Sequence, residues 1–136
     1  MSNYKFLKPY TFKNGVTVKN RVVIPPMTEG SSLADGSVSD EELAYFKQRA
    51  GGVGIFISPV ANINPLGKGF PGELSVEDDK FIPRLREMAE TMKINGTRAI
   101  LQIFSAGRMS NSAALGGQQI VSASAVAAPR EGFETP

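Results

Sequence analysis

The 136-residue sequence contains no cysteine and no histidine. Without cysteine, disulfides, thiolate metal sites and a cysteine nucleophile are excluded. Without histidine, the chain lacks the commonest general base and the commonest metal ligand. Carboxylate pairs do not replace them, because Glu41–Glu42 and Asp78–Asp79 stand where helices are expected to begin and where negative charge is stabilising. We therefore assign no catalytic residue and no metal ligand to this chain.

Long apolar runs and blocks of like charge are also missing. No run approaches the roughly 20 residues that span a bilayer, and residues 1–6 lack the apolar core of a signal peptide. The 15 basic and 13 acidic residues are scattered and leave a net charge of +2, with no basic block to follow a phosphate backbone. We expect a cytoplasmic protein that binds neither membranes nor nucleic acids. Its 41% hydrophobic content is enough for a folded core.

The first third of the chain predicts a hairpin, a short strand and a helix. Residues 10–13 and 16–19 alternate in character around Asn14–Gly15, the strongest short signal for a tight turn. The β-branched run at 21–24 stops at two prolines, which cannot donate to a strand ladder. Ser39 and Glu42 then have the spacing of a capping box at a helix start. The apolar stripe expected along that helix consists of Leu43, Phe46 and Ala50.

The middle of the chain predicts two further strands and a second helix. Residues 53–57 form a continuous apolar run, typical of a strand buried on both faces, and we expect it to end at Pro59. A helix beginning at Asp78–Asp79 and ending at Asn95–Gly96 precedes a third buried strand at 99–103. The buried stripe of this helix is Phe81, Leu85, Met88 and Met92, and its outward residues are Lys80, Arg84, Glu87 and Glu90. After Arg108 we expect a loop, with a possible short strand at 119–121.

This order of elements predicts a parallel sheet with right-handed crossovers. A doubly wound nucleotide-binding sheet would carry a glycine-rich phosphate loop after its first strand, but residues 25–29 are Pro-Pro-Met-Thr-Glu. A (β/α)8 barrel with an N-terminal hairpin fits better, although a whole barrel needs roughly 250 residues. The predicted fold is therefore α/β, the N-terminal part of such a barrel. It divides into a hairpin at 1–20, β-α-β-α-β at 21–108 and a loop at 109–136.

In a barrel, ligands bind where the strands end, and five polar side chains follow the three predicted strand ends. They are Thr28, Ser58, Gln102, Ser105 and Arg108. Gln102 is the most informative, because a buried amide must find hydrogen-bond partners. It either bonds a neighbouring strand or a water, or it holds a planar ligand with polar edges at the barrel mouth.

Five ordered motifs resemble the old yellow enzyme family, and they cover nearly the whole chain. They are Lys-Asn-Arg-Val-Val-Ile-Pro-Pro-Met-Thr at 19–28, the helix start at 39–46, Arg-Ala-Gly-Gly-Val-Gly at 49–54, the loop at 64–72, and Leu-Gln-Ile-Phe-Ser-Ala-Gly-Arg at 101–108. The resemblance implies an FMN-binding barrel. In such enzymes NAD(P)H reduces FMN, and the flavin then passes hydride to the β-carbon of an activated alkene.

The resemblance also implies which residues would contact the cofactor. Pro25, Pro26, Met27 and Thr28 would lie along the flavin ring, with the Thr28 hydroxyl bonded to the carbonyl at position 4. The backbone near Val60 and the side chain of Gln102 would contact the pyrimidine end of the ring.

Two departures from the family pattern limit what this chain can do alone. Ser105 stands where the family motif has histidine, and the family's histidine pair, tyrosine proton donor and phosphate-binding loops all come after residue 136. We expect the N-terminal portion of an FMN-dependent oxidoreductase that is inactive by itself. The alternative is a non-catalytic partial barrel that another polypeptide completes. A stand-alone binding module is disfavoured, because three parallel strands leave unpaired edges that promote association with the rest of a barrel or self-association.

Overall fold

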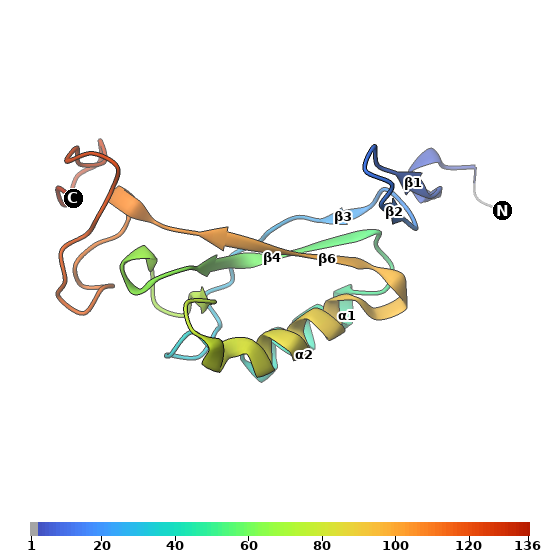
Figure 1. Cartoon of the computed structure of the whole chain (residues 1–136), viewed down its shortest axis with the longest axis horizontal. Helices are drawn as coiled ribbons and strands as arrows, with labels where there is room; N and C mark the ends of the chain where they lie inside the picture. The colour runs from blue at the N-terminus through green and yellow to red at the C-terminus, as the bar shows by residue number, and fades with distance from the viewer. Residues whose placement is uncertain (1–2) are drawn as a thin grey trace.

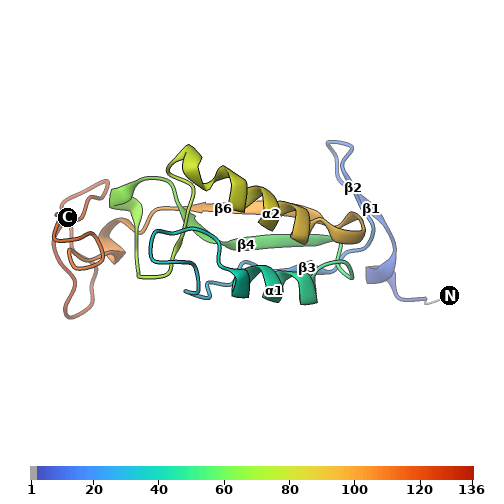
Figure 2. The ribbon, with the colours of Figure 1, turned by 90° about the horizontal axis from the view of Figure 1, so that it is seen from below.

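The computed structural model describes residues 3–136 as a parallel sheet with two helices packed on one face (Figure 1). The strands are β1 (Tyr10–Thr11), β2 (Thr17–Val18), β3 (Val23–Ile24), β4 (Ile55–Asn62), β5 (Leu74–Ser75) and β6 (Arg98–Phe104). The helices are α1 (Asp40–Arg49) and α2 (Ile82–Met92), with single 3-10 turns at Lys5–Leu7, Pro65–Gly67, Asp79–Phe81, Ile94–Gly96 and Gly107–Met109. The hairpin lies beyond the amino ends of the main strands, and the C-terminal segment lies at the opposite end (Figures 1 and 2).

Strand β4 is the centre of the sheet. Strand β6 pairs with it in parallel along one edge, while β3 and β5 pair in parallel with the start and the end of the other edge. Helix α1 follows β3 and helix α2 follows β5, and the two run side by side on one face of the sheet (Figures 1 and 2). The arrangement confirms the predicted α/β fold with parallel strands. Strand β5 was not predicted, because two residues within a loop rich in glycine and proline carry no periodic signal.

The predicted hairpin forms as β1 and β2, which pair antiparallel with Thr11 opposite Thr17. Gly15 closes the turn with a φ of +85°, a conformation that glycine adopts at little steric cost. The Asn14 side chain accepts a hydrogen bond from the Val16 amide and stabilises the same turn. Residues 1 and 2 of the predicted hairpin segment lie outside the described part of the chain.

The capping box predicted for α1 is present in full. The Ser39 hydroxyl accepts from the Glu42 amide at 3.1 Å, and the Glu42 carboxylate accepts from the Ser39 amide at 2.9 Å. Phe46 is buried, with Leu43 and Ala50 partly buried beside it, so the predicted stripe is also confirmed. The core between sheet and helices consists of Val38, Phe46, Phe56, Ala61, Leu74, Met88 and Met92.

Helix α2 matches its predicted stripe, and one residue of its predicted outward face, Arg84, is only partly exposed because it also contacts the segment before α1. Phe81, Met88 and Met92 are buried. Arg84 was expected to face solvent, yet its Nε donates to the Val38 carbonyl at 3.0 Å and its guanidinium pairs with Asp40 at 2.6 Å. Arg84 therefore ties α2 to the start of α1.

The prediction that the strand beginning at residue 53 ends at Pro59 is wrong. Strand β4 continues to Asn62, because the ladder with β6 shifts register between Ile57 and Val60. A bulge leaves one extra residue of one strand outside the pairing. Proline has no amide hydrogen to contribute to a ladder, so Pro59 is tolerated there.

The prediction that the strand at 99–103 is buried is also wrong, because part of this strand is exposed in the structure of residues 3–136. Ile100 is 46% exposed and Ile103 is 65% exposed. Among the described residues, β6 has β4 on one edge only. Ile100 lies on the face without helices, and Ile103, although its partner Ala61 is in the core, lies where the helices do not cover β6. The suggested strand at 119–121 does not form either, although Ile120 is buried.

The Lys-Asn-Arg segment joins three parts of the structure at the amino end of the sheet. The Lys19 ammonium donates to the carbonyls of Gly51 and Asn95, which follow α1 and α2, where a cation complements the helix dipole. The Asn20 side chain donates to the Gly52 carbonyl at 2.8 Å. An added Cβ on Gly54 would overlap the Asn20 carbonyl oxygen. The motifs at 19–21 and 51–54 therefore fit together as one unit.

Candidate functional site at the carboxyl end of the sheet

Two of the predicted site residues are direct neighbours on adjacent strands. Val60 of β4 is the register partner of Gln102 of β6, immediately after the bulge. Register partners in a parallel sheet present their side chains to the same face. Both residues are half-buried. The carboxyl half of β4 and the middle of β6 therefore meet where a barrel enzyme binds its ligand.

The segment Pro25–Thr28 directly follows β3, which pairs with the other edge of β4. Ile24 is the partner of Phe56, so the residues after β3 run in the same direction as the carboxyl half of β4. All four side chains are exposed, with Met27 at 39%. No partner within residues 3–136 bonds the Thr28 hydroxyl. The strand that leads into this segment, β3, and the strand that carries Gln102, β6, pair with opposite edges of β4.

Gln102 carries an unusual feature for a strand residue. Its Oε1 atom is buried and accepts no hydrogen bond from any described residue. Buried side-chain oxygens are nearly always satisfied. The Gln102 side chain therefore does not bond a neighbouring strand through Oε1, and the two remaining donors for it are a water molecule and a ligand at the barrel mouth.

The other polar residues expected at the strand ends divide between buried and exposed positions. Ser58 is 1% exposed, and its hydroxyl accepts a hydrogen bond from the backbone N–H of Gln102 at 3.0 Å, within the sheet. Ser105 and Arg108 are exposed beyond the end of β6. Ser105 lies beside the loop after β4, because an added Cβ on Gly67 would meet its Oγ at 3.3 Å.

Two carboxyl groups near this end of the sheet have perturbed acidity. Burial raises the pKa of Glu29, next to Thr28, and a hydrogen bond with Tyr45 partly offsets the effect. Burial also raises the pKa of Glu73, which is 1% exposed. Its Oε2 accepts from the Gly69 amide at 2.6 Å, whereas its Oε1 has no partner among residues 3–136. No sequence pattern indicates a role for Glu73, since an acid in a glycine-rich loop is usually solvated.

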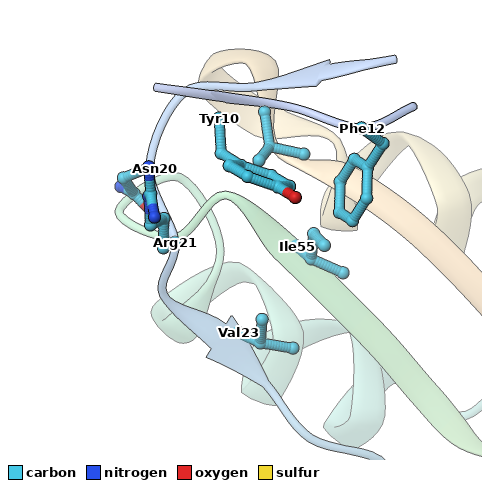
Figure 3. A pocket seen from close by; sticks show the side chains of 7 residues that line it. Tyr10, Phe12, Asn20, Arg21, Val23 and Ile55 are labelled. Carbon is cyan, nitrogen blue, oxygen red and sulfur yellow. The ribbon is translucent and has the colours of Figure 1, made fainter. Parts of the chain in front are cut away.

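A mainly apolar hollow lies at the opposite end of the sheet. It has a volume of about 300 Å³ and is lined by the hairpin and the amino ends of β3 and β4. Figure 3 shows Tyr10 and Phe12 of the hairpin above Val23 and Ile55 of the sheet. In parallel barrels that end of the sheet serves stability and not ligand binding. The carboxyl end of the sheet is therefore the candidate ligand-binding site.

Residues 5–135 match the model of the NADH:flavin oxidoreductase / NADH oxidase family. The chain belongs to this family. The resemblance to old yellow enzymes carried by the five motifs is thus confirmed. Members of the family use FMN and NAD(P)H and bind small-molecule substrates.

Within the flavin oxidoreductase family, curated relatives share about two fifths of their residues with this chain. It is 42% identical over 135 residues to NADH:fumarate oxidoreductase of Klebsiella pneumoniae, covering 99% of this chain and 15% of that protein. It is 44% identical over 125 residues to NADH:acrylate oxidoreductase of Vibrio harveyi, covering 92% and 12%. The probable NADH-dependent flavin oxidoreductase YqiG of Bacillus subtilis is 41% identical over 100 residues, covering 74% and 27%. The chain therefore spans between 12% and 27% of these relatives.

Solved structures of flavin oxidoreductases give the same picture. Morphinone reductase superposes with a TM-score of 0.83 at 28% identity, covering 98% of this chain and 35% of that chain. A 2-naphthoyl-CoA reductase superposes with a TM-score of 0.86 at 26% identity, covering 96% and 22%. The old yellow enzyme homologue from Zymomonas mobilis, at 24% identity and a TM-score of 0.81, has the same fold over 97% of this chain. The open sheet therefore matches part of the barrel in these enzymes.

Among residues 3–136, neither α1 nor α2 has the length and apolar character of a membrane-spanning helix.

Proposed function

We propose that this chain forms part of an FMN-dependent NAD(P)H oxidoreductase that reduces activated alkenes, and that it supplies the residues facing the flavin ring. The observation that carries the proposal is the buried, unpartnered Oε1 of Gln102 beside Val60, at the carboxyl end of a parallel sheet. A planar ligand with a hydrogen-bond donor on its edge would satisfy that oxygen. The pyrimidine end of a flavin is such a ligand.

The remaining candidate residues suit the other parts of the ring. Pro25, Pro26 and Met27 are exposed and mainly apolar, as a surface for a flat aromatic ring should be. The hydroxyl of Thr28 is exposed and available to donate to a ring carbonyl. The FMN cofactor, when bound, supplies hydride transfer between NAD(P)H and the substrate. This chain would bind and orient its ring.

The names of the relatives support the substrate class. Fumarate and acrylate, named for two of them, are both alkenes conjugated to a carboxylate. Other relatives are named NADH oxidase and metal reductase, so the acceptor differs among proteins that share this segment. Use of a reduced nicotinamide is the feature common to most of the names. We therefore propose an activated alkene as acceptor and assign the choice of alkene to residues outside this chain.

The free edge of the sheet at β6 supports a partner for this chain. Ile100, Leu101 and Ile103 of β6 are each more than 40% exposed, next to an edge with unpaired backbone groups. Such an edge associates with further strands. We propose that the rest of a barrel covers it, supplied by the same or another polypeptide, and that the isolated 136 residues have no turnover.

Substitution of Gln102 tests the proposal directly. In the native polypeptide that contains this chain, Gln102→Leu keeps a similar volume and removes the amide. FMN affinity, measured by fluorescence titration, should weaken roughly tenfold, the equivalent of one strong hydrogen bond at about 1.4 kcal/mol per factor of ten. The matched control is Gln48→Leu on the exposed surface of α1, which should bind FMN normally.

Unfolding of the apoprotein separates a cofactor role from a structural one. If Gln102 contacts FMN, the urea midpoint of the apo Gln102→Leu variant should stay close to that of the parent. A destabilised apoprotein that binds FMN with parental affinity would make Gln102 a core residue and overturn the assignment.

A further inference from the structure

The bulge in β4 decides which side chains reach the candidate site. Phe56 and Ala61 both belong to the core beneath the sheet, although they are five positions apart in the chain. Side chains alternate between faces along a strand, so an odd separation would put these two on opposite faces of a regular strand. The register shift between Ile57 and Val60 supplies the extra residue that returns Ala61 to the core face. It thereby also turns Val60 to the open face beside Gln102.

The Ser58 hydroxyl holds this bulge together with two hydrogen bonds. Its Oγ accepts from the backbone N–H of Gln102 at 3.0 Å and donates to the Pro59 carbonyl at 2.7 Å. Ser58 is 1% exposed, so bulk water does not compete for either bond. In a regular ladder the backbone N–H of Gln102 would donate to a β4 carbonyl. Here it donates to a side chain from the bulge instead.

We infer that Ser58 is a positioning residue for the flavin site, and that it acts by fixing the backbone of Gln102 so that the unpartnered Oε1 meets the ring. The inference rests on the proposed function, since it deepens the role of the same site. Ser58 does not itself face the ligand, because its Oγ is already used by Gln102 and Pro59. Without that hydroxyl, the bulge can relax and Gln102 can shift along or away from β4.

The chain offers a matched control on the same pair of strand segments. Thr97 is 2% exposed, and its Oγ1 donates to the Val53 carbonyl at 2.8 Å. It joins the chain just before β6 to the chain just before β4, at the amino end of the sheet and away from the candidate site. Ser58→Ala and Thr97→Val therefore each remove one buried hydroxyl between the same two strand regions.

The experiment measures FMN affinity and the visible flavin spectrum in the native polypeptide. Ser58→Ala should weaken FMN binding about three- to tenfold and shift the flavin absorption band, as expected for loss of one positioning hydrogen bond. Thr97→Val should lower the urea midpoint of the apoprotein but leave FMN affinity and spectrum unchanged. If Ser58→Ala is not recovered folded, Ser58→Cys keeps the volume with a weaker hydrogen-bonding group and should show the same effects at smaller size.

A double-mutant cycle tests whether Ser58 acts through Gln102. In the Gln102→Leu background, Ser58→Ala should change FMN affinity less than about twofold, because interacting residues give non-additive effects. Fully additive effects, or equal FMN affinities for Ser58→Ala and Thr97→Val, would overturn the role of Ser58 while the proposed function stands. A native polypeptide that binds no FMN would overturn both. An unchanged affinity in Gln102→Leu alone would overturn the Gln102 contact and this inference with it.

Discussion

Gly54→Ala is the substitution whose cost the structure determines most directly. A Cβ added to Gly54 would overlap the Asn20 carbonyl oxygen and lie 3.0 Å from its carbonyl carbon and 3.1 Å from its Oδ1. These are backbone atoms and a side chain that already donates to the Gly52 carbonyl, so they cannot yield by a rotamer change. The segment before β3 would have to move away from β4.

That movement has a calculable effect on stability. Overpacking of this kind costs about 1–3 kcal/mol. Separation also weakens the bond from the Gly54 amide to the Val22 carbonyl, now 3.0 Å, and the bond from Asn20 to Gly52, now 2.8 Å. Each such bond contributes about 0.5–1.5 kcal/mol. We expect Gly54→Ala to lower the free energy of unfolding by roughly 2–5 kcal/mol.

Gly52→Ala is the control two residues away. An added Cβ on Gly52 would meet no atom within 4 Å. Replacing glycine at an unstrained position stabilises by about 0.4–1 kcal/mol through the unfolded chain. Urea unfolding of the native polypeptide, followed by circular dichroism, compares the two variants. If the free energies of unfolding of Gly54→Ala and Gly52→Ala differ by less than about 0.5 kcal/mol, the close contact between residues 19–21 and 51–54 does not stabilise the sheet.

Two further predictions concern the candidate site. Thr28→Ala should lower the flavin reduction potential while FMN stays bound, because one hydrogen bond to a carbonyl that gains charge on reduction stabilises the reduced form by about 1–3 kcal/mol; an unchanged potential in a spectroelectrochemical titration would make Thr28 only a turn residue. Glu73 has a pKa raised by burial, so its contribution to stability is complete below the ordinary glutamate pKa and is lost as the pH rises through the raised value. Glu73→Gln keeps an acceptor for the Gly69 amide and should flatten this part of the pH–stability curve; parallel curves for variant and parent would refute the assignment.

The sequence by itself determined the local elements and the family of this protein. Asn14–Gly15 specifies the hairpin, and Ser39 with Glu42 specifies where α1 begins, because turn and cap geometry depend on residues that are neighbours in the chain. The stripe of Phe81, Met88 and Met92 specifies the buried face of α2 in the same way. The five motifs were sufficient to identify the flavin oxidoreductase family.

Only the tertiary structure decided how these elements meet at the site. Pro59 indicates a strand end when β4 is read alone, and it is a bulge residue only because β6 pairs on both sides of it. The burial of Glu73 and the exposure of Ile103 depend on which segments pack against them, and the sequence pattern is the same in either case. Gln102 could be recognised as an amide in an apolar strand. That its Oε1 is buried without a partner among the described residues, and that its backbone N–H bonds a hydroxyl 44 residues earlier, depends on how β6 packs against β4. Long-range pairing, and not local preference, therefore fixed the geometry of the candidate site.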